Sequence, residues 1–281
     1  MGAQVKDQPL LEVDLLCVDF PGKGFRATPN RVLKDVSFRI RPGETLGLVG
    51  ESGSGKTTIG RAVLGLVEPS AGRIVFDGTD ITHASRAQRR RIARDVQVVF
   101  QDPYTSLNPS MTIESILTEP LTAAGTDRAQ AQRRVGELLD RVHLPSDAAY
   151  RLPREFSGGQ RQRIAIARAI ALGPRLIVCD EPVSALDLTT QARVLELFTE
   201  IQETTGVAYL FVSHDLGVVR HVSHNVMVLY RGDVVEAGRA DQVTSRPQHP
   251  YTQKLLMSAP VPDPVAQRVR REERRALAQS A

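Results

Sequence analysis

A run of residues from Gly50 to Thr57 has the composition and spacing of a phosphate-binding loop. It reads Gly-Glu-Ser-Gly-Ser-Gly-Lys-Thr and fits the pattern G-x-x-x-x-G-K-[ST]. Glycines let backbone N–H groups wrap around the β- and γ-phosphates of a nucleotide, because no Cβ stands in the way. Lys56 adds a positive charge for these phosphates, and the hydroxyl of Thr57 is a ligand for Mg²⁺. The residues that we predict to bind the nucleotide are Gly50, Glu51, Ser52, Gly53, Ser54, Gly55, Lys56, Thr57 and Thr58.

A pair of carboxylates, Asp180 and Glu181, follows the apolar run 176–179. We interpret this run as a buried strand, and open α/β sheets bind ligands at the carboxyl ends of their strands. Asp180 would hold Mg²⁺, mostly through water, and Glu181 would polarise the water that attacks a phosphate. Alone, such a pair could equally end a strand and cap the next turn. With the phosphate-binding loop upstream, we expect a site that hydrolyses a nucleoside triphosphate.

Both motifs need strands and helices to position them, and the hydrophobic pattern indicates where these elements lie. Short apolar runs that predict buried strands occur at 45–49, 96–100, 176–179 and 207–212. Helical patterns occur at 57–66, 160–172 and 191–204. Buried strands that alternate with helices favour a parallel sheet. We therefore expect an α/β fold: a P-loop NTPase core with a mainly parallel sheet, an N-terminal antiparallel β subdomain and a helical insertion subdomain.

The character of the sequence changes after Gln101, where turn-forming residues precede a mainly helical stretch. We expect a helical subdomain at about 102–156, inserted into one ATPase domain that spans 8–245. The residues at 246–281 are interrupted by prolines and then become charged, which predicts a C-terminal extension.

Composition excludes several classes of protein. The 281 residues carry a formal charge of +4, and 41% of them are hydrophobic, which is typical of a soluble globular protein. Aromatic residues make up only 5%, with no Trp, which argues against a stacking surface for nucleic acid. No apolar run is long enough to span a bilayer, and residues 1–10 lack the apolar region of a signal peptide. We expect a cytosolic protein with no nucleic-acid partner.

The two cysteines and two clusters of arginines are further candidates for a binding site. Cys17 and Cys179 lie in apolar, strand-like contexts, so we expect buried thiols, and their spacing indicates neither zinc nor an iron–sulfur cluster. Arginines cluster at 86–94 and at 268–275. Such clusters can bind nucleic acid or an anionic membrane, but we interpret both as solvated helix faces, the usual role of charge runs.

The stretch from Arg154 to Arg163 resembles the signature of the ATP-binding-cassette ATPases. That family carries a phosphate loop, a glutamine loop, the signature, an acidic strand, a dimer-contact loop and a switch histidine, in this order. The corresponding residues follow the same order here, over roughly 10–246: 50–57, Gln101, 157–160, Asp180-Glu181, Ser184-Ala185-Leu186-Asp187 and His214. The resemblance implies ATP and Mg²⁺ as ligands and ATP hydrolysis as the activity.

The same resemblance implies roles for single residues. Gln101 would contact Mg²⁺ and the attacking water, and relay the nucleotide state to the helical insertion. His214 would touch the γ-phosphate and hold the geometry of the water and Glu181. The implied catalytic residues are Glu181, His214 and Gln101. The implied metal ligands are Thr57, Gln101 and Asp180.

The family also places an aromatic ring beside adenine. Phe20 and Phe25 both lie in the corresponding region of this sequence. We favour Phe20, but the widened turn at 21–29 leaves the register open, so Phe25 stays an alternative.

A second anion site is indicated where Ser157, Gly158 and Gly159 begin the predicted helix. One chain has only one phosphate loop to match it. In the family, two subunits pair head to tail, and each signature closes over the ATP of the other. The residues implied to bind ATP in trans are Ser157, Gly158, Gly159 and Gln160. The residues implied in the dimer contact are Ser184, Ala185, Leu186 and Asp187, and whether the pair is homomeric or heteromeric stays open.

The segments 99–109 and 249–256, together with Phe156, resemble the oligopeptide, dipeptide and nickel importer branch of this family. The branch implies a peripheral subunit at the cytoplasmic face of the bacterial inner membrane. Its partners would be a second ATPase subunit, two transmembrane permease subunits and, indirectly, a solute-binding protein. We expect peptides as the cargo, with nickel and other small solutes left open. Some members hold an iron–sulfur cluster in a cysteine-bearing tail, but no Cys follows Cys179, so we expect none here.

Two other functions are alternatives to transport. A soluble cassette ATPase in DNA repair or translation usually carries two cassettes, a long coiled coil or a zinc insertion, and this sequence has none of these. A nucleotide-dependent scaffold without catalysis is the other alternative. The presence of Glu181 and His214 argues against it.

Overall fold

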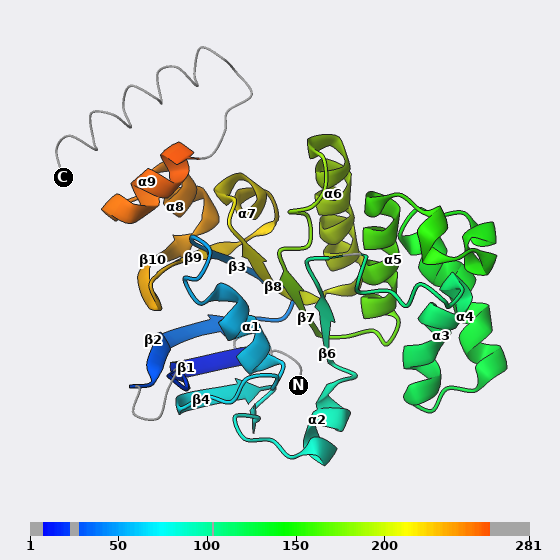
Figure 1. The fold of residues 1–281 in the computed structure, drawn as a ribbon, viewed down its shortest axis with the longest axis horizontal. Coiled ribbons are helices and arrows are strands. Elements are labelled where there is room, and N and C mark those ends of the chain that lie inside the picture. Colours follow the sequence, from blue (N-terminus) through cyan, green and yellow to red (C-terminus); the bar gives the residue numbers. More distant parts are fainter. Residues whose placement is uncertain (1–7, 23–27, 103, 259–281) are drawn as a thin grey trace, which may run out of the picture.

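The computed structural model describes residues 8–22, 28–102 and 104–258, and its N-terminal part contains an antiparallel sheet (Figure 1). The strand order in this sheet is β2-β1-β4-β5. The strands are β1 (Leu11–Phe20), β2 (Asn30–Ile40), β4 (Ala71–Phe76) and β5 (Thr79–Asp80). Leu11 and Val13 are fully buried whereas Glu12 between them is half-buried, as expected for a strand with one face on a core. The predicted antiparallel β subdomain is therefore confirmed.

The larger sheet has the strand order β10-β9-β3-β8-β7-β6. Its strands are β3 (Thr45–Val49), β6 (Val96–Val99), β7 (Leu176–Asp180), β8 (Ala208–Ser213), β9 (Asn225–Tyr230) and β10 (Asp233–Arg239). Neighbouring strands from β9 to β6 pair in parallel, and β10 alone pairs antiparallel with β9. This is the mainly parallel sheet that the alternation of strands and helices predicted.

Helices cover both faces of the larger sheet (Figure 1). The helices of the described residues are α1 (Lys56–Val63), α2 (Arg86–Ile92), α3 (Ile113–Ala123), α4 (Arg128–Arg141), α5 (Gly158–Ile170), α6 (Leu188–Thr205), α7 (Leu216–Val222), α8 (Ala240–Ser245) and α9 (Pro250–Ser258). Short 3₁₀ helices at Ser146–Tyr150 and Pro153–Glu155 join α4 to α5. No helix of the described residues is long and apolar enough to cross a membrane.

Strand β8 shows how the sheet divides the core. Tyr209 and Phe211 point to one face and pack edge-on against Phe198 of α6, with ring centroids 5.4 and 5.5 Å apart. Leu210 points to the opposite face, in a cluster that includes Ile59 of α1 and residues of the N-terminal sheet. Because successive side chains of a strand alternate between faces, one buried strand supports both cores. Helix α1 is thereby held between the two sheets.

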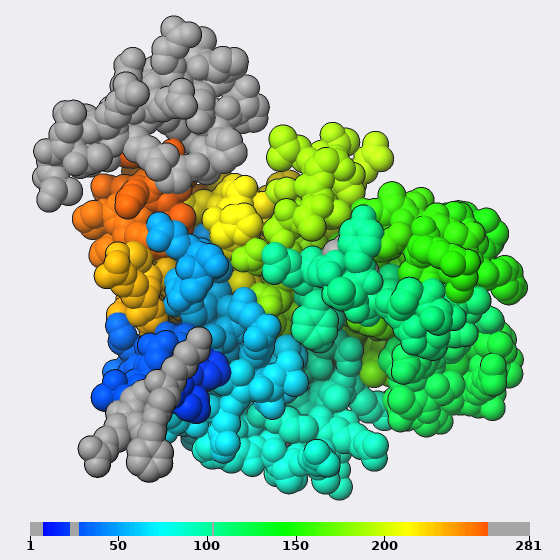
Figure 2. Space-filling model, viewed as in Figure 1, coloured from blue at the N-terminus to red at the C-terminus, as the bar shows by residue number. Residues whose placement is uncertain are grey.

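The helical end of the molecule is formed by α3, α4 and α5 (Figure 1). It is drawn in green in the space-filling view, opposite the side that carries β10, α8 and α9 (Figure 2). Helix α3 begins after Thr112, whose hydroxyl accepts from the N–H of Ser115. Helix α4 begins after Asp127, which accepts from the N–H groups of Ala129 and Gln130. These caps satisfy donors that the first turn of a helix leaves unpaired.

Helix α2 carries the first arginine cluster, and most of that cluster is exposed as expected. Arg89 differs, because it is half-buried and its guanidinium donates to the carbonyl groups of Val63 and Ile81 at 3.0 and 2.5 Å. This arginine fixes α2 to the end of α1. The cluster at 268–275 lies outside the described residues. Cys17 and Cys179 are both buried and free, as predicted.

Candidate nucleotide-binding site

The phosphate-binding loop lies between β3 and α1, as its motif requires. Gly55 precedes α1 with a φ of 109°, a conformation that side chains rarely adopt, and no side chain caps the helix. The N–H groups of its first turn are therefore free of a side-chain cap and can face an anion. Gly53 also has a positive φ, of 81°. The two glycines thus allow the turn that exposes these donors.

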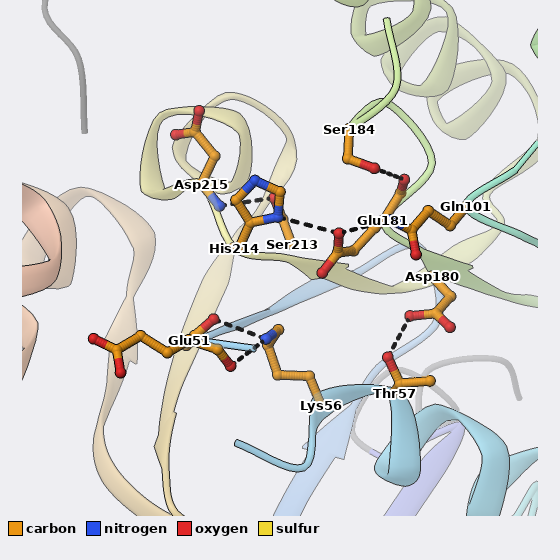
Figure 3. Close-up of polar contacts among 11 residues, drawn as sticks. Glu51, Lys56, Thr57, Gln101, Asp180, Glu181, Ser184, Ser213, His214 and Asp215 are labelled. Carbon is orange, nitrogen blue, oxygen red and sulfur yellow. Dashed lines mark hydrogen bonds and ion pairs between the residues drawn. The ribbon is translucent and has the colours of Figure 1, made fainter. Parts of the chain in front are cut away.

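Lys56 is 4% exposed and folds back onto the loop. Its Nζ donates to the carbonyl oxygens of Gly50 and Glu51 at 2.7 and 2.9 Å (Figure 3). Burial lowers the pKa of this ammonium group, and the carboxylates of Glu181 and Asp180 oppose that change. A buried cation held only by carbonyl groups can exchange them for phosphate oxygens, which carry full negative charge.

Thr57 and Asp180 meet at the beginning of α1 and the end of β7. The Thr57 hydroxyl donates to Oδ1 of Asp180 at 2.9 Å (Figure 3). Burial raises the pKa of Asp180, and the hydrogen bond from Thr57 partly offsets this. Among the described residues, no three His, Cys, Asp or Glu side chains gather as a metal cage. One carboxylate and one hydroxyl nevertheless fit Mg²⁺, which takes oxygen ligands and is commonly completed by water and nucleotide phosphates.

Glu181 follows Asp180 and is contacted from the ends of both neighbouring strands. Its Oε2 lies 3.1 Å from Nδ1 of His214, which follows β8, and accepts from Nε2 of Gln101 at 3.4 Å, which follows β6 (Figure 3). The Glu181 side chain is 17% exposed and that of His214 is 57% exposed. The backbone of Glu181 has a φ of 48°, which is uncommon for a residue with a side chain. Such a conformation is typical of functional sites held by surrounding structure.

The signature residues lie at the beginning of α5, away from α1 in Figure 1. Ser157 caps the helix, because its Oγ accepts from the N–H of Gln160 at 3.3 Å and its own N–H donates to Oε1 of Gln160 at 2.9 Å. Gly158 and Gly159 form the first turn. Ser157, Gly159 and Gln160 border a hollow of about 270 Å³, which Arg163 and Arg193 also line. Among the described residues, no hydrogen bond or ion pair joins the signature to the phosphate-binding loop.

The segment from Ser184 to Asp187 connects the acidic strand end to α6. The Ser184 hydroxyl donates to the Glu181 carbonyl at 3.1 Å. Ala185 is exposed, whereas Leu186 packs partly against the core. Asp187 caps α6, since it accepts from the N–H and hydroxyl of Thr190 at 3.0 and 2.7 Å. These hydrogen bonds also lower the pKa of Asp187.

The remaining predicted residues lie around this centre. Phe20 ends β1 and is 39% exposed, so its ring is accessible, while Phe25 lies outside the described residues. Ser52, Gly53 and Thr58 belong to the loop and α1.

One contact of the loop was not predicted. The N–H of Glu51 donates to the hydroxyl of Tyr251 in α9 at 2.8 Å. The residues are 200 positions apart, and no periodicity or spacing in the sequence indicates that they meet.

Comparison with known proteins identifies the family to which these site residues and motifs belong. Residues 33–184 match the family described as ABC transporter, and residues 235–280 match the C-terminal region of oligopeptide/dipeptide transporters. A Brucella ovis protein, named as an ATP-binding protein for peptide import, is 49% identical over 92% of this chain and 81% of its own length.

Two further proteins are similar over most of this chain. The glutathione import ATP-binding protein GsiA of Pectobacterium atrosepticum is 48% identical over 92% of the chain. The chain spans only 42% of that relative's length. The solved dimeric cassette MJ0796, in a post-hydrolysis state bound to ADP and Pi, is 28% identical with a TM-score of 0.73, over 82% of this chain and 98% of that one. The six-stranded and antiparallel sheets, the ordered motifs and these matches together place the chain in the ABC transporter family.

Proposed function

We propose that this chain binds and hydrolyses ATP and thereby energises a bacterial ABC importer, most directly an importer of peptides. The observation that carries the proposal is the convergence of Gln101 and His214 on Glu181, beside the pair of Thr57 and Asp180. The match of 235–280 to oligopeptide/dipeptide transporters supports import over a role in DNA repair or translation. Nickel and other small solutes stay open as cargo, and the glutathione import relatives add a peptide-like solute.

The loop and its lysine would bind the phosphates of ATP. The backbone N–H groups at the beginning of α1 have no side-chain cap, and Lys56 would transfer its hydrogen bonds from the carbonyl groups of Gly50 and Glu51 to phosphate oxygens. Thr57 and Asp180 would hold Mg²⁺, with Gln101 as a further ligand. Bound Mg²⁺ supplies positive charge to the phosphate oxygens. Phe20 would stack on adenine.

Glu181 would act as the base that polarises the attacking water. Its carboxylate is mostly buried and ends a strand that also carries Asp180, so it lies beside the proposed phosphate site. His214 bonds the same carboxylate oxygen that Gln101 approaches, and both would hold the direction of that carboxylate. A fixed base of this kind lowers the barrier to hydrolysis because it positions the attacking water and also accepts a proton from it.

The signature would serve a second subunit. Ser157, Gly158, Gly159 and Gln160 lie at a helix N-terminus, and within the described residues no hydrogen bond or ion pair joins them to the loop of the same chain, so they would close over ATP bound by a partner. The segment from Ser184 to Asp187 would lie in the contact between the subunits. The dimeric state of the solved cassette MJ0796 supports this arrangement. Two permease subunits and a solute-binding protein would complete the importer at the cytoplasmic face of the membrane, with 8–245 as the ATPase domain and 246–281 as an extension.

Replacement of the proposed base tests the function. Glu181→Gln keeps the size of the side chain but removes its charge, so ATP binding should persist while turnover falls by about 10²-fold or more. The variant should also accumulate as an ATP-bound dimer in size-exclusion chromatography. If Glu181→Gln hydrolyses ATP at the rate of the parent, the assigned mechanism is wrong.

A further inference from the structure

Helix α9 reaches the phosphate-binding loop through the side chain of Tyr251. Tyr251 is 8% exposed, and its hydroxyl accepts the hydrogen bond from the N–H of Glu51. Lys56 holds the carbonyl group of the same residue at 2.9 Å. The backbone of Glu51 is therefore fixed on one side by a residue of the loop and on the other side by a residue of α9.

The ring of Tyr251 is itself held in place. It lies against the ring of Tyr230, which ends β9, with centroids 4.3 Å apart and an angle of 39° between the planes. Residue 50 must be glycine here, because a Cβ on Gly50 would lie 2.2 Å from the carbonyl oxygen of Leu229. The end of β9 thus contacts both the first residue of the loop and the side chain that bonds to the second.

A carboxylate on β10 anchors the beginning of α9. Oε1 of Glu236 accepts from the N–H of Gln248 at 2.8 Å, and Oε2 accepts from the N–H of His249 at 3.1 Å. The N–H of Tyr251 then donates to Nδ1 of His249 at 3.1 Å. These bonds define where α9 begins and hence where the Tyr251 hydroxyl lies.

We propose that Tyr251 is a positioning residue that holds the phosphate-binding loop ready for nucleotide, so that the placement of α9 sets nucleotide affinity. This inference rests on the proposed binding of ATP by the loop. When Lys56 turns to the phosphates, it gives up its bond to the Glu51 carbonyl, and the Tyr251 hydroxyl keeps its hold on that residue. A loop that is already ordered loses less conformational entropy on binding, so the tyrosine should tighten binding without touching the nucleotide.

The test compares Tyr251→Phe with Tyr230→Phe in the full chain. Both variants keep the contact between the two rings and lose one hydroxyl, but the Tyr230 hydroxyl makes no hydrogen bond to the residues that the structure describes. Isothermal titration with MgADP should give a dissociation constant about three- to tenfold weaker for Tyr251→Phe, the effect of one net hydrogen bond. Tyr230→Phe should bind like the parent. With ATP, the KM of Tyr251→Phe should rise by the same factor while kcat stays within about twofold.

Hydrogen exchange supplies a readout that is independent of catalysis. The peptide that contains Glu51 should exchange faster in Tyr251→Phe and not in Tyr230→Phe, because the amide has lost its acceptor. Glu236→Gln weakens the anchor of α9. It should weaken MgADP binding when introduced into the parent, but it should weaken binding little further when added to Tyr251→Phe. Equal effects of Glu236→Gln in both backgrounds would refute the route through Tyr251.

The outcomes separate this inference from the function on which it rests. If the parent does not bind MgADP, the proposed function fails. If the parent binds and Tyr251→Phe has the same affinity and exchange as Tyr230→Phe, the role of Tyr251 is refuted while the nucleotide site stands.

Discussion

A methyl group added at Gly159 would collide with Thr190 where α5 packs on α6. A Cβ on Gly159 would lie 2.1 Å from Cγ2 of Thr190, whereas ordinary contacts begin at 3.4 Å. Thr190 is not free to rotate, because its hydroxyl donates to Asp187 at 2.7 Å. Gly159→Ala therefore has to separate the two helices or break the hydrogen bond from the Thr190 hydroxyl to Asp187.

Both routes have a known cost. Forcing an extra methyl group into a packed contact destabilises a protein by about 1–3 kcal/mol, and alanine regains up to about 1 kcal/mol through its better helix propensity. We therefore expect Gly159→Ala to lower the free energy of unfolding by up to about 2 kcal/mol relative to the parent, and by about 1–3 kcal/mol relative to an alanine in the same turn that meets no close contact. Gly158 is the matched control, because the atoms nearest to its added Cβ lie at 3.5 and 3.7 Å. Gly158→Ala should be neutral or slightly stabilising.

Urea denaturation followed by circular dichroism measures these differences. Thr190→Ser supplies a rescue, because it removes Cγ2 and keeps the hydroxyl that bonds Asp187. The double variant Gly159→Ala with Thr190→Ser should regain most of the lost stability. The reasoning is refuted if Gly159→Ala is as stable as Gly158→Ala, or if the serine gives no recovery.

Two further predictions concern titratable groups. Hydrogen bonds from the hydroxyl and N–H of Thr82 lower the pKa of Asp80 to about 2 from 3.8. The carboxylate stabilises the fold above its unfolded pKa and loses this effect as the pH falls through about 2, so Asp80→Asn should cost stability at pH 7 and match the parent near pH 2 in urea titrations. Burial raises the pKa of the Cys179 thiol, so it should react with a thiol reagent only after denaturation, and rapid labelling of the folded chain would contradict this.

The sheets were predictable because burial leaves a mark in the sequence. Strand β3 matches its expected range because each of its residues is buried, so it reads as an unbroken apolar run. Helix boundaries were less predictable. The expected helix at 191–204 begins at Leu188, because Asp187 caps it through Thr190, whereas the sequence pattern showed Asp187 only as part of a family motif. The predicted beginning of a helix at Ser157 is confirmed, because Ser157 caps α5 and the helix begins directly after it.

The sequence names the members of the proposed site, but it does not predict how their side chains are arranged. Gln101, Glu181 and His214 follow β6, β7 and β8, which are neighbours in the sheet, although they are far apart in the chain. Only the strand order brings the side chains of Gln101 and His214 to the same carboxylate oxygen of Glu181, and a single sequence does not fix that order. The bond between Tyr251 and Glu51 is harder still, because neither residue type nor spacing marks a contact between a loop and a distant helix.

The contacts around α6 connect the proposed catalytic base to the proposed lid of a second site. The carbonyl group of Glu181 accepts a hydrogen bond from the Ser184 hydroxyl. Asp187, three residues after Ser184, accepts a hydrogen bond from the Thr190 hydroxyl. Thr190 in turn packs closely on Gly159, where an added Cβ would lie 2.1 Å from Cγ2 of Thr190. Because packed contacts shift as units rather than bend gradually, a movement of the backbone at Glu181 should displace the beginning of α5. In a head-to-tail dimer, hydrolysis at one site would then alter the signature that closes the other.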